Sequence, residues 1–401
     1  MAKGTNHSEP ITLNGIYYDL ELAIGGANIT PRSINYGQIT GIAITNDLLS
    51  HKSGIVIQFI DRSAGILTDV DATSSTLVQF GLSCSSKRFE TAINSTYTID
   101  HSPLINHEGS NTEYAILASH NASLRLQKQV AIYEENLAPT DILKKIFASI
   151  NLTLITKDDH TTNKRVTYIS DQNMSVRQQI EDLCNLMSFD VGPTYVAFNM
   201  ETENYMTVCP TKKFDEKMYR KYILTGSTDA VTTDQAANVI EYHEEITGFD
   251  VEKARELFNE KKIWEFNHQN RKWTNTEFKF DKIKKLLSNT EAAHSFSYEQ
   301  QEWEQNTPYV KGAVYSPNDR EIGRNLREAF ISARVLVCKV IGDLFLDAGK
   351  FILLDGGDVL NKKYGGVWLI VSVIHRIERG TFVTEMKLSR AYSLKSQERN
   401  M

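Results

Sequence analysis

The sequence predicts a mainly β protein with α+β parts, built around two related antiparallel β-barrels. Short runs of alternating apolar and polar residues fill the first 130 residues, and this period of two is typical of strands with one buried face. Similar runs return after residue 323. The 401 residues exceed what one hydrophobic core ordinarily supports, so we expect several domains.

The first predicted domain, residues 1–130, consists of seven short strands. Gly25-Gly26, Asn46-Asp47 and Gly65 lie between some of them and are residue types that reverse the chain. Seven short strands with turn signals between many of them predict a small antiparallel barrel or sandwich. The strands are expected at 16–22, 39–44, 55–60, 76–82, 92–99, 113–118 and 124–132.

The second predicted domain, residues 131–222, is a small α+β domain. Thr140 is a suitable N-cap for a helix that runs to Ile150. Ser175 and Gln178 have the spacing of a capping box, and apolar residues follow them at helical intervals. Two strand patterns, at 194–198 and 205–209, complete the domain.

The second predicted barrel comprises residues 223–249 and 323–395, and residues 396–401 form a tail. A helix is expected at about 320–332, with Asn318-Asp319 as its cap. The first and last β segments have similar lengths and similar patterns of short apolar runs, so we expect their barrels to superpose. The last segment's strands are expected at 335–341, 350–354, 367–377 and 382–388.

A polar insertion, residues 250–322, interrupts the second barrel. It contains Trp264, Trp273 and Trp303, which are the candidate interface residues. Tryptophan supplies much of the contact energy when an interface buries it, but the three could instead form a small core of their own. The basic run 279–285 is either a solvated helix face or a phosphate contact.

Composition and charge exclude several classes of protein. The formal net charge of −6 disfavours a general nucleic-acid binder, whose surface is basic. No run approaches the roughly 20 apolar residues of a membrane helix, and the first residues lack the apolar segment of a secretory signal. The four cysteines lie far apart without C-x-x-C spacing, so we expect free, buried thiols.

No catalytic motif is complete. His243-Glu244-Glu245 has Thr247 where a zinc site needs a second histidine. Gly349-Lys350 precedes a strand, whereas a phosphate loop opens a helix. Residues 355–358, D-G-G-D, lack the further oxygen ligands of a calcium loop and predict a hairpin turn. We therefore expect no enzymatic activity, no catalytic residue, no cofactor and no metal, although converging glycosidase carboxylates would leave no sequence motif.

The segment 341–388 carries a family resemblance. Gly342 and Gly349 enclose an apolar stretch, a strand follows, and a V-x-x-V-x-H strand ending near His375 returns as a hairpin. This pattern resembles the central baseplate hub protein of contractile-tailed phages, which carries the cell-puncturing spike. The helix at 320–332, the strand at 54–61 and the helices at 139–150 and 175–189 fit the same order. The insertion fits least.

The resemblance implies a structural virion protein. Two barrels per chain around a threefold axis would form a pseudo-sixfold ring that joins a threefold spike to a sixfold tail tube. The implied partners are two further copies of this chain, the central spike, tube or tube-initiator proteins, and neighbouring baseplate wedge proteins. The implied location is the virion tail, assembled in the host cytoplasm. Alternatives are the hub of a type VI-like contractile injection system, a baseplate cell-wall hydrolase, and a host-receptor adhesin.

Such a ring would line a channel through which phage DNA passes during ejection without specific binding. Residues 1–110 contain six Lys or Arg against ten Asp or Glu. Basic walls would hold DNA phosphates, whereas walls of like charge leave the polyanion mobile. We therefore expect an acidic or neutral channel wall, although these acids could equally keep an outer surface soluble.

Overall fold

The computed structural model confirms a mainly β protein with α+β parts. It describes residues 8–26, 29–61, 76–86, 91–101, 104–108, 111–157, 160, 165–170, 173–210, 219–224, 236–247, 263–267, 272–276, 317–356, 360 and 363–393. The tail at 396–401, the basic run at 279–285 and most of the 250–322 insertion lie outside these residues. None of the helices in these ranges is long and apolar enough to cross a membrane.

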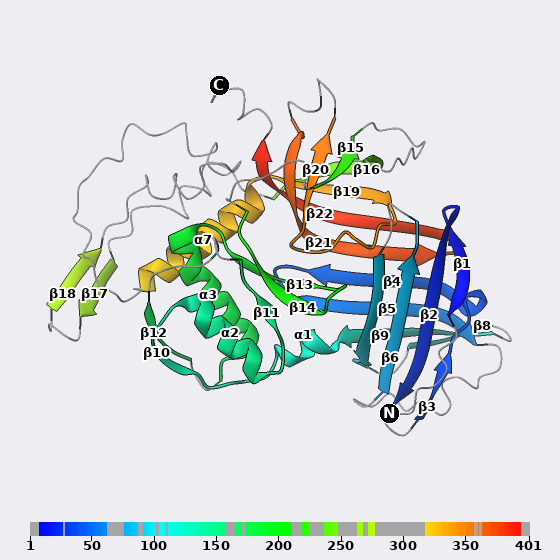
Figure 1. Ribbon diagram of the computed structural model, residues 1–401, viewed down its shortest axis with the longest axis horizontal. Coiled ribbons are helices and arrows are strands. Elements are labelled where there is room, and N and C mark those ends of the chain that lie inside the picture. Colours follow the sequence, from blue (N-terminus) through cyan, green and yellow to red (C-terminus); the bar gives the residue numbers. More distant parts are fainter. Residues whose placement is uncertain are drawn as a thin grey trace.

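The first β portion is antiparallel throughout (Figure 1). Buried residues alternate with more exposed ones along its strands, as the sequence pattern predicted. In β5, for example, Ile55, Ile57 and Phe59 are buried. The path β1-β2-β6-β7-β9-β5-β4 comprises β1 (Glu9–Leu13), β2 (Ile16–Gly26), β6 (Thr76–Cys84), β7 (Thr91–Ile99), β9 (Asn111–His120), β5 (Lys52–Asp61) and β4 (Ile39–Asp47). Off this path, β3 (Ile29–Ser33) pairs with β2 and β8 (Leu104–Glu108) pairs with β9, while η1 (Tyr36–Gln38) precedes β4.

The prediction of a seventh strand at 124–132 is wrong. Residues 121–125 form the short helix α1 (Asn121–Arg125) instead. The Nδ1 atom of His120 accepts a hydrogen bond from the backbone N–H of Ala122 and thereby caps this helix. The side-chain cap from His120 favours the start of a helix here, although the apolar and polar residues that follow alternate as they do in a strand.

In the part of the chain that the structure describes, the second β portion is a closed ring of six strands. Its order is β21-β20-β15-β16-β19-β22, and β22 pairs back onto β21. Strand β15 runs parallel to both of its neighbours, so the ring is mixed, whereas we predicted an antiparallel barrel. Residues 224–235 separate β15 from β16, and parallel neighbours need a connection longer than a tight hairpin. The strands are β15 (Arg220–Ile223), β16 (Ala236–Glu245), β19 (Val335–Ile341), β20 (Phe351–Asp355), β21 (Gly366–Glu378) and β22 (Thr381–Ser393).

The two β portions are joined by a strand pair. Strand β4 pairs with β21 from Asp47↔Ser372 to Ile42↔Ile377, so one hydrogen-bonded path runs through both portions. Among the described ladders, only those of the second portion close into a ring. The exact domain limits and the superposition of the two barrels remain predictions.

The α+β module lies beside the β portions and contains the two predicted helices (Figure 1). The predicted capping box of α3 is confirmed, with Ser175 and Gln178 in mutual contact. The predicted cap of α2 is wrong, because the helix starts at Pro139 and Ala138 is its N-cap; proline suits a first position, where no N–H is needed. The module contains β10 (Tyr133–Leu137), α2 (Pro139–Ser149), β11 (Leu154–Ile155), β12 (Val166–Ile169), α3 (Val176–Val191), β13 (Tyr195–Asn199) and β14 (Asn204–Val208).

Helix α7 (Pro317–Ala333) begins within the last residues of the predicted insertion and packs along α3. At Gly323 the two helices approach so closely that a Cβ atom would collide with the backbone carbonyl of Asn185. A continuous apolar core extends from the first β portion through the module into the ring. All four cysteines are free and buried, as predicted.

Candidate functional site

The ring, the first β portion and the α+β module meet around one loop, which we call the junction loop (Gly342–Lys350). Its two terminal glycines are places of close approach. A Cβ atom on Gly342 would overlap the ring of Phe382, and one on Gly349 would overlap the side chain of Ala197. Gly349 also has a φ of +86°, a conformation that favours glycine. The glycines that carry the family pattern are therefore packing requirements.

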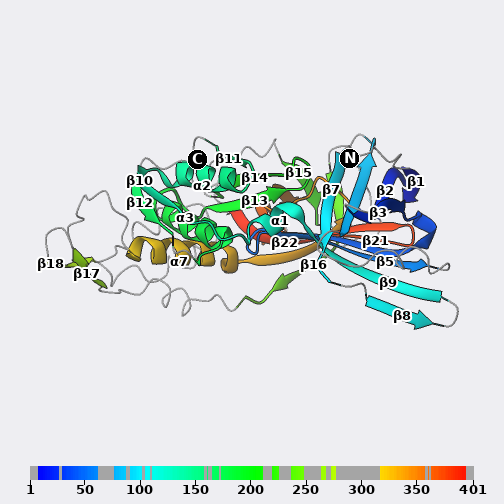
Figure 2. The same cartoon turned by 90° about the horizontal axis from the view of Figure 1, so that it is seen from below.

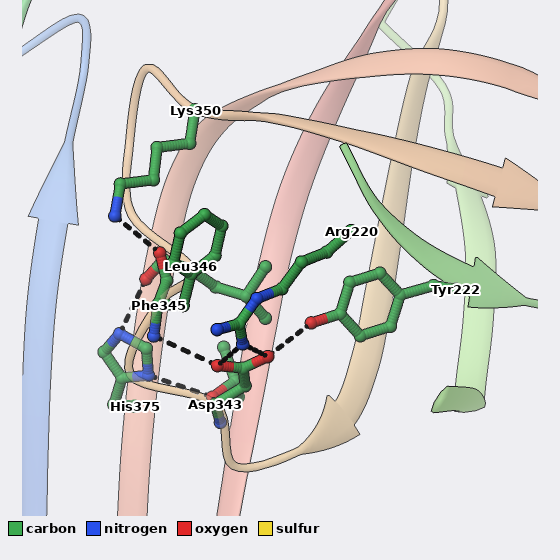
Figure 3. Close-up of polar contacts among 8 residues, drawn as sticks. Arg220, Tyr222, Asp343, Phe345, Leu346, Lys350 and His375 are labelled. Atoms are coloured by element: carbon green, nitrogen blue, oxygen red, sulfur yellow. Dashed lines mark hydrogen bonds and ion pairs between the residues drawn. The ribbon is translucent and has the colours of Figure 1, made fainter. Parts of the chain in front are cut away.

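The carboxylate of Asp343 anchors the first half of the loop to strand β15 (Figure 3). It accepts hydrogen bonds from Arg220 Nη1 at 2.6 Å and from the Tyr222 hydroxyl at 2.7 Å. It also accepts one from the backbone N–H of Phe345 at 3.0 Å. The Asp343 side chain is 1% exposed, so this charge depends on its partners for the solvation that water would otherwise provide.

His375 holds the loop from the opposite side, on strand β21 (Figure 3). Its Nε2 lies 3.0 Å from the carbonyl oxygen of Leu346 and its Nδ1 lies 2.9 Å from the hydroxyl of Thr384. A carbonyl can only accept, so Nε2 carries the proton and Nδ1 accepts from the hydroxyl, which in turn accepts from the Asp343 N–H. Complete burial lowers the pKa of His375 to about 4 and keeps the imidazole neutral.

Asp347 ties the second half of the loop to both other parts of the molecule. Its carboxylate accepts from the Asn46 side-chain amide at 2.5 Å, from the Met200 N–H at 2.8 Å and from the Ala348 N–H at 2.9 Å. The same Asn46 amide donates to the carbonyl of Phe198 at 2.9 Å. Burial raises the pKa of Asp347 to about 6, although these donors favour the ionised form. Strand β4, the β13–β14 turn and the junction loop are thus joined at one carboxylate.

Two cations cover the ring of Phe345. Lys350 Nζ lies 4.1 Å and the Arg220 guanidinium carbon 3.9 Å from the ring centroid. Lys350 also donates to the Phe345 carbonyl at 2.8 Å, and burial lowers the pKa of this amine. The charged groups of the junction therefore contact one another and the protein backbone, an arrangement suited to fixing geometry.

Histidine–carboxylate contacts make two further ties to the module. His120 Nε2 lies 3.3 Å from Glu203, and this hydrogen bond lowers the pKa of Glu203. His51 Nε2 lies 3.6 Å from Glu181, which also accepts from Arg327 at 2.9 Å. Burial opposes ionisation of Glu181, but these two partners outweigh it and bring its pKa to about 2. These contacts connect the module to the first β portion and to helix α7.

The predicted interface tryptophans are only partly placed. Trp264 lies on β17 (Ile263–Asn267) and Trp273 on β18 (Lys272–Thr276), and these strands form a two-stranded sheet of their own. Figure 1 shows this hairpin beyond α7, on the side away from the first β portion. Trp303 lies outside the described residues. The structure brings the first two tryptophans onto paired strands, while their role as interface residues stays a prediction.

The sequence did not identify the junction residues as functional. Asp343, Asp347 and His375 lie within the family-like segment, but partners such as Asn46 and Arg220 are far away in the chain. The available signal was two acidic residues between glycines in an otherwise apolar stretch, since buried carboxylates require partners. Within the described ranges, no three His, Cys, Asp or Glu side chains lie close enough to hold a metal ion.

Comparison with known proteins identifies the fold. No family model matches the chain, and no curated protein matches it by sequence. A tail protein from Neisseria meningitidis MC58 is similar with a TM-score of 0.53 and 10% identity, over 92% of this chain and 96% of that one. The 43 kDa tail protein of prophage MuSo2 from Shewanella oneidensis is similar with a TM-score of 0.54 and 9% identity, over 93% and 98%. The resemblance predicted from residues 341–388 is thereby confirmed at the level of architecture: the chain has the fold of phage tail proteins.

Proposed function

We propose that this chain is a structural component of a phage tail, the trimeric baseplate hub that joins the tail tube to the central spike. The observation that carries the proposal is the extent of the likeness, because the two tail proteins match over nearly their whole length and nearly all of this chain.

The arrangement of the β portions supports a hub. Each chain contributes two β portions that are joined through β4 and β21. Three copies around a threefold axis would supply six such units, which suits a connection between threefold and sixfold neighbours. The buried ties at the junction loop would keep the two units of each chain in a fixed relation while force passes along the tail.

In this proposal the partners are two further copies of the chain, the spike, the tube or its initiator, and neighbouring baseplate wedge proteins. The chain would be located in the virion tail, and the assembly of three copies would line part of the DNA channel. We propose an acidic or neutral wall and no specific binding of DNA. We further propose that the protein has no enzymatic activity; a zymogram on host cell wall should show no clearing.

The molar mass in solution tests the assembly. Light scattering on the purified chain should give the mass of a trimer, and electron microscopy should show a ring with a central channel. A monomer at high micromolar concentration, with no ring even when the spike is present, would contradict the proposal. A calculated potential that shows a channel lined mainly by Lys and Arg would contradict the proposed wall.

A further inference from the structure

Strand β8 of the first β portion is paired on one side only and carries exposed apolar side chains. Strand β8 pairs with the beginning of β9, from Leu104↔Ala115 to Glu108↔Asn111. We call these residues, 104–108 and 111–115, the β8 arm. Figure 2 shows the arm extending from the body of the molecule. No described strand pairs with the outer edge of β8.

Both faces of the arm carry exposed apolar side chains. Leu104 is 65% exposed and Ile105 is 57% exposed, and neighbouring residues of a strand point to opposite faces. Leu117 of β9 lies on the same face as Leu104, because it is two residues from Ala115, and it is also exposed. An apolar strand with an unpaired edge is a site at which another chain can add.

Two other exposed edges of this β portion, those of β1 and β3, contain proline. Asn14 and Gly15 both have positive φ and form a two-residue turn between β1 and β2. In such a hairpin the closing pair, Leu13↔Ile16, exchanges both hydrogen bonds, so Pro10 faces the outer edge. Proline has no N–H to offer there, and β3 contains Pro31.

Strand β8 lacks such protection. Its sequence, LINHE, contains neither proline nor lysine. In an antiparallel pair the backbone N–H and C=O groups of alternate residues point away from the partner strand, so those of β8 point outward along its unpaired edge. The edge can therefore both donate to and accept from an added strand or segment.

We propose that the β8 arm docks onto a second copy of this chain and forms part of the contact between neighbouring copies in the trimer; this inference rests on the proposed trimer. The size of the arm argues for this occupant. A stable interface between two proteins buries about 800 Å² on each partner, far more than a five-residue strand presents. The arm can therefore act only as an extension of a larger contact, which neighbouring copies around a closed ring supply.

The test compares two pairs of substitutions in the full-length protein. The variant L104D/I105D places charges on both faces of the arm. The matched control, Y133D/I169D, alters two exposed residues that lie opposite each other on β10 and β12, away from the arm. We expect the arm variant to raise the dissociation constant of the trimer at least about 100-fold and the control to leave it within about threefold. Circular dichroism and thermal melting check that both variants fold.

A second measurement does not depend on weakening the trimer. Since the native cysteines are buried, the Ile105→Cys thiol can be labelled with a maleimide and compared with the Ile169→Cys thiol. Docking predicts labelling at position 105 at least about tenfold slower than at position 169 in the trimer, with the difference lost on dilution to monomers. If the trimer persists in the arm variant and both thiols react equally fast, the arm inference is overturned while the trimer stands. A wild-type protein that is monomeric at every concentration overturns both.

Discussion

His375 and Asp347 are buried titratable residues whose pKa values shift in opposite directions. Burial lowers the pKa of His375 from 6.5 to about 4, so the folded protein resists protonation there. Burial raises the pKa of Asp347 from 3.8 to about 6, so the folded protein retains a proton that the unfolded chain releases. Each shift makes the free energy of unfolding depend on pH, and the two dependences oppose each other.

The contribution of His375 is present above pH 6.5 and is lost as the pH falls towards 4, because the unfolded chain takes up the proton first. It amounts to about 3 kcal/mol. Replacing the residue, His375→Gln, should remove this loss, and the missing hydrogen bond should lower stability by about 1–3 kcal/mol at neutral pH. Urea unfolding at pH steps between about 4 and about 7.5 measures both effects.

Asp347 provides the control with the opposite sign. Its protonated form favours the folded state, so its contribution is present below pH 3.8 and is lost as the pH rises through about 6. In the Asp347→Asn variant this dependence disappears, and stability should fall more steeply towards acid than in the unaltered protein. Parallel pH profiles for all three proteins would contradict the assignment of these two residues.

Gly349 should be among the least tolerant positions in the chain. Its φ is positive, and a Cβ atom would also overlap Ala197. Gly380 has a similar φ of +83° but nothing lies within 4 Å of its missing Cβ. Gly380→Ala should therefore cost about 1 kcal/mol for backbone strain alone. Gly349→Ala should cost about 1–3 kcal/mol more because of overpacking. Thermal unfolding of both variants measures the difference, and equal costs would mean that the junction loop can move away from β13.

At the scale of the element, strand β15 contains two adjacent ion pairs in different surroundings. Arg220 contacts the buried Asp343, whereas Lys221 contacts Asp355 at 2.5 Å with 40% and 29% of the two side chains exposed. Arg220→Leu leaves a buried carboxylate without its cation and should lower stability by about 3 kcal/mol. Lys221→Leu should cost less than about 1 kcal/mol, because water screens an exposed pair. Denaturant unfolding compares them; comparable losses would show that burial does not strengthen the Asp343 pair.

Elements with local causes could be predicted from the sequence. The capping box of α3 and the alternating strands of the first β portion depend on neighbouring residues, and both are confirmed. The false strand at 124–132 arose because the alternation is strand-like, whereas the cap from His120 starts a helix. The parallel direction of β15 could not be predicted, since it depends on pairing with residues 352–355 and 236–238.

At the scale of the whole molecule, the candidate site was the least predictable part. Asn46 meets Asp347, and Arg220 meets Asp343, only because the chain returns to the same place after long separations. A single sequence contains no local signal for such meetings. The family resemblance located the segment 341–388 but gave no reason for its glycines and acidic residues. The contacts of the junction loop with the ring, the first β portion and the module provide that reason.

The tryptophans of the insertion provide a test at this scale. The β17–β18 hairpin forms its own small sheet, separate from the ring. We therefore expect Trp264→Ala and Trp273→Ala to leave folding and trimer formation intact, and we predict the same result for Trp303→Ala. At least one should weaken incorporation into the baseplate by about tenfold or more. Reconstitution with neighbouring baseplate proteins measures this, with Tyr17→Ala, an exposed aromatic elsewhere, as the control. Loss of folding in every variant would instead mean that the tryptophans form a core of their own.

The pairing of β4 with β21 has a consequence for how the protein is made. Asn46 cannot meet its strand partner Val373 until residue 373 has left the ribosome. During that interval the nascent chain displays the open edge of β4, and such edges favour aggregation. Contacts of such long range also make folding slow. Overexpression at high temperature should therefore yield inclusion bodies, and slower synthesis or added chaperones should recover soluble protein.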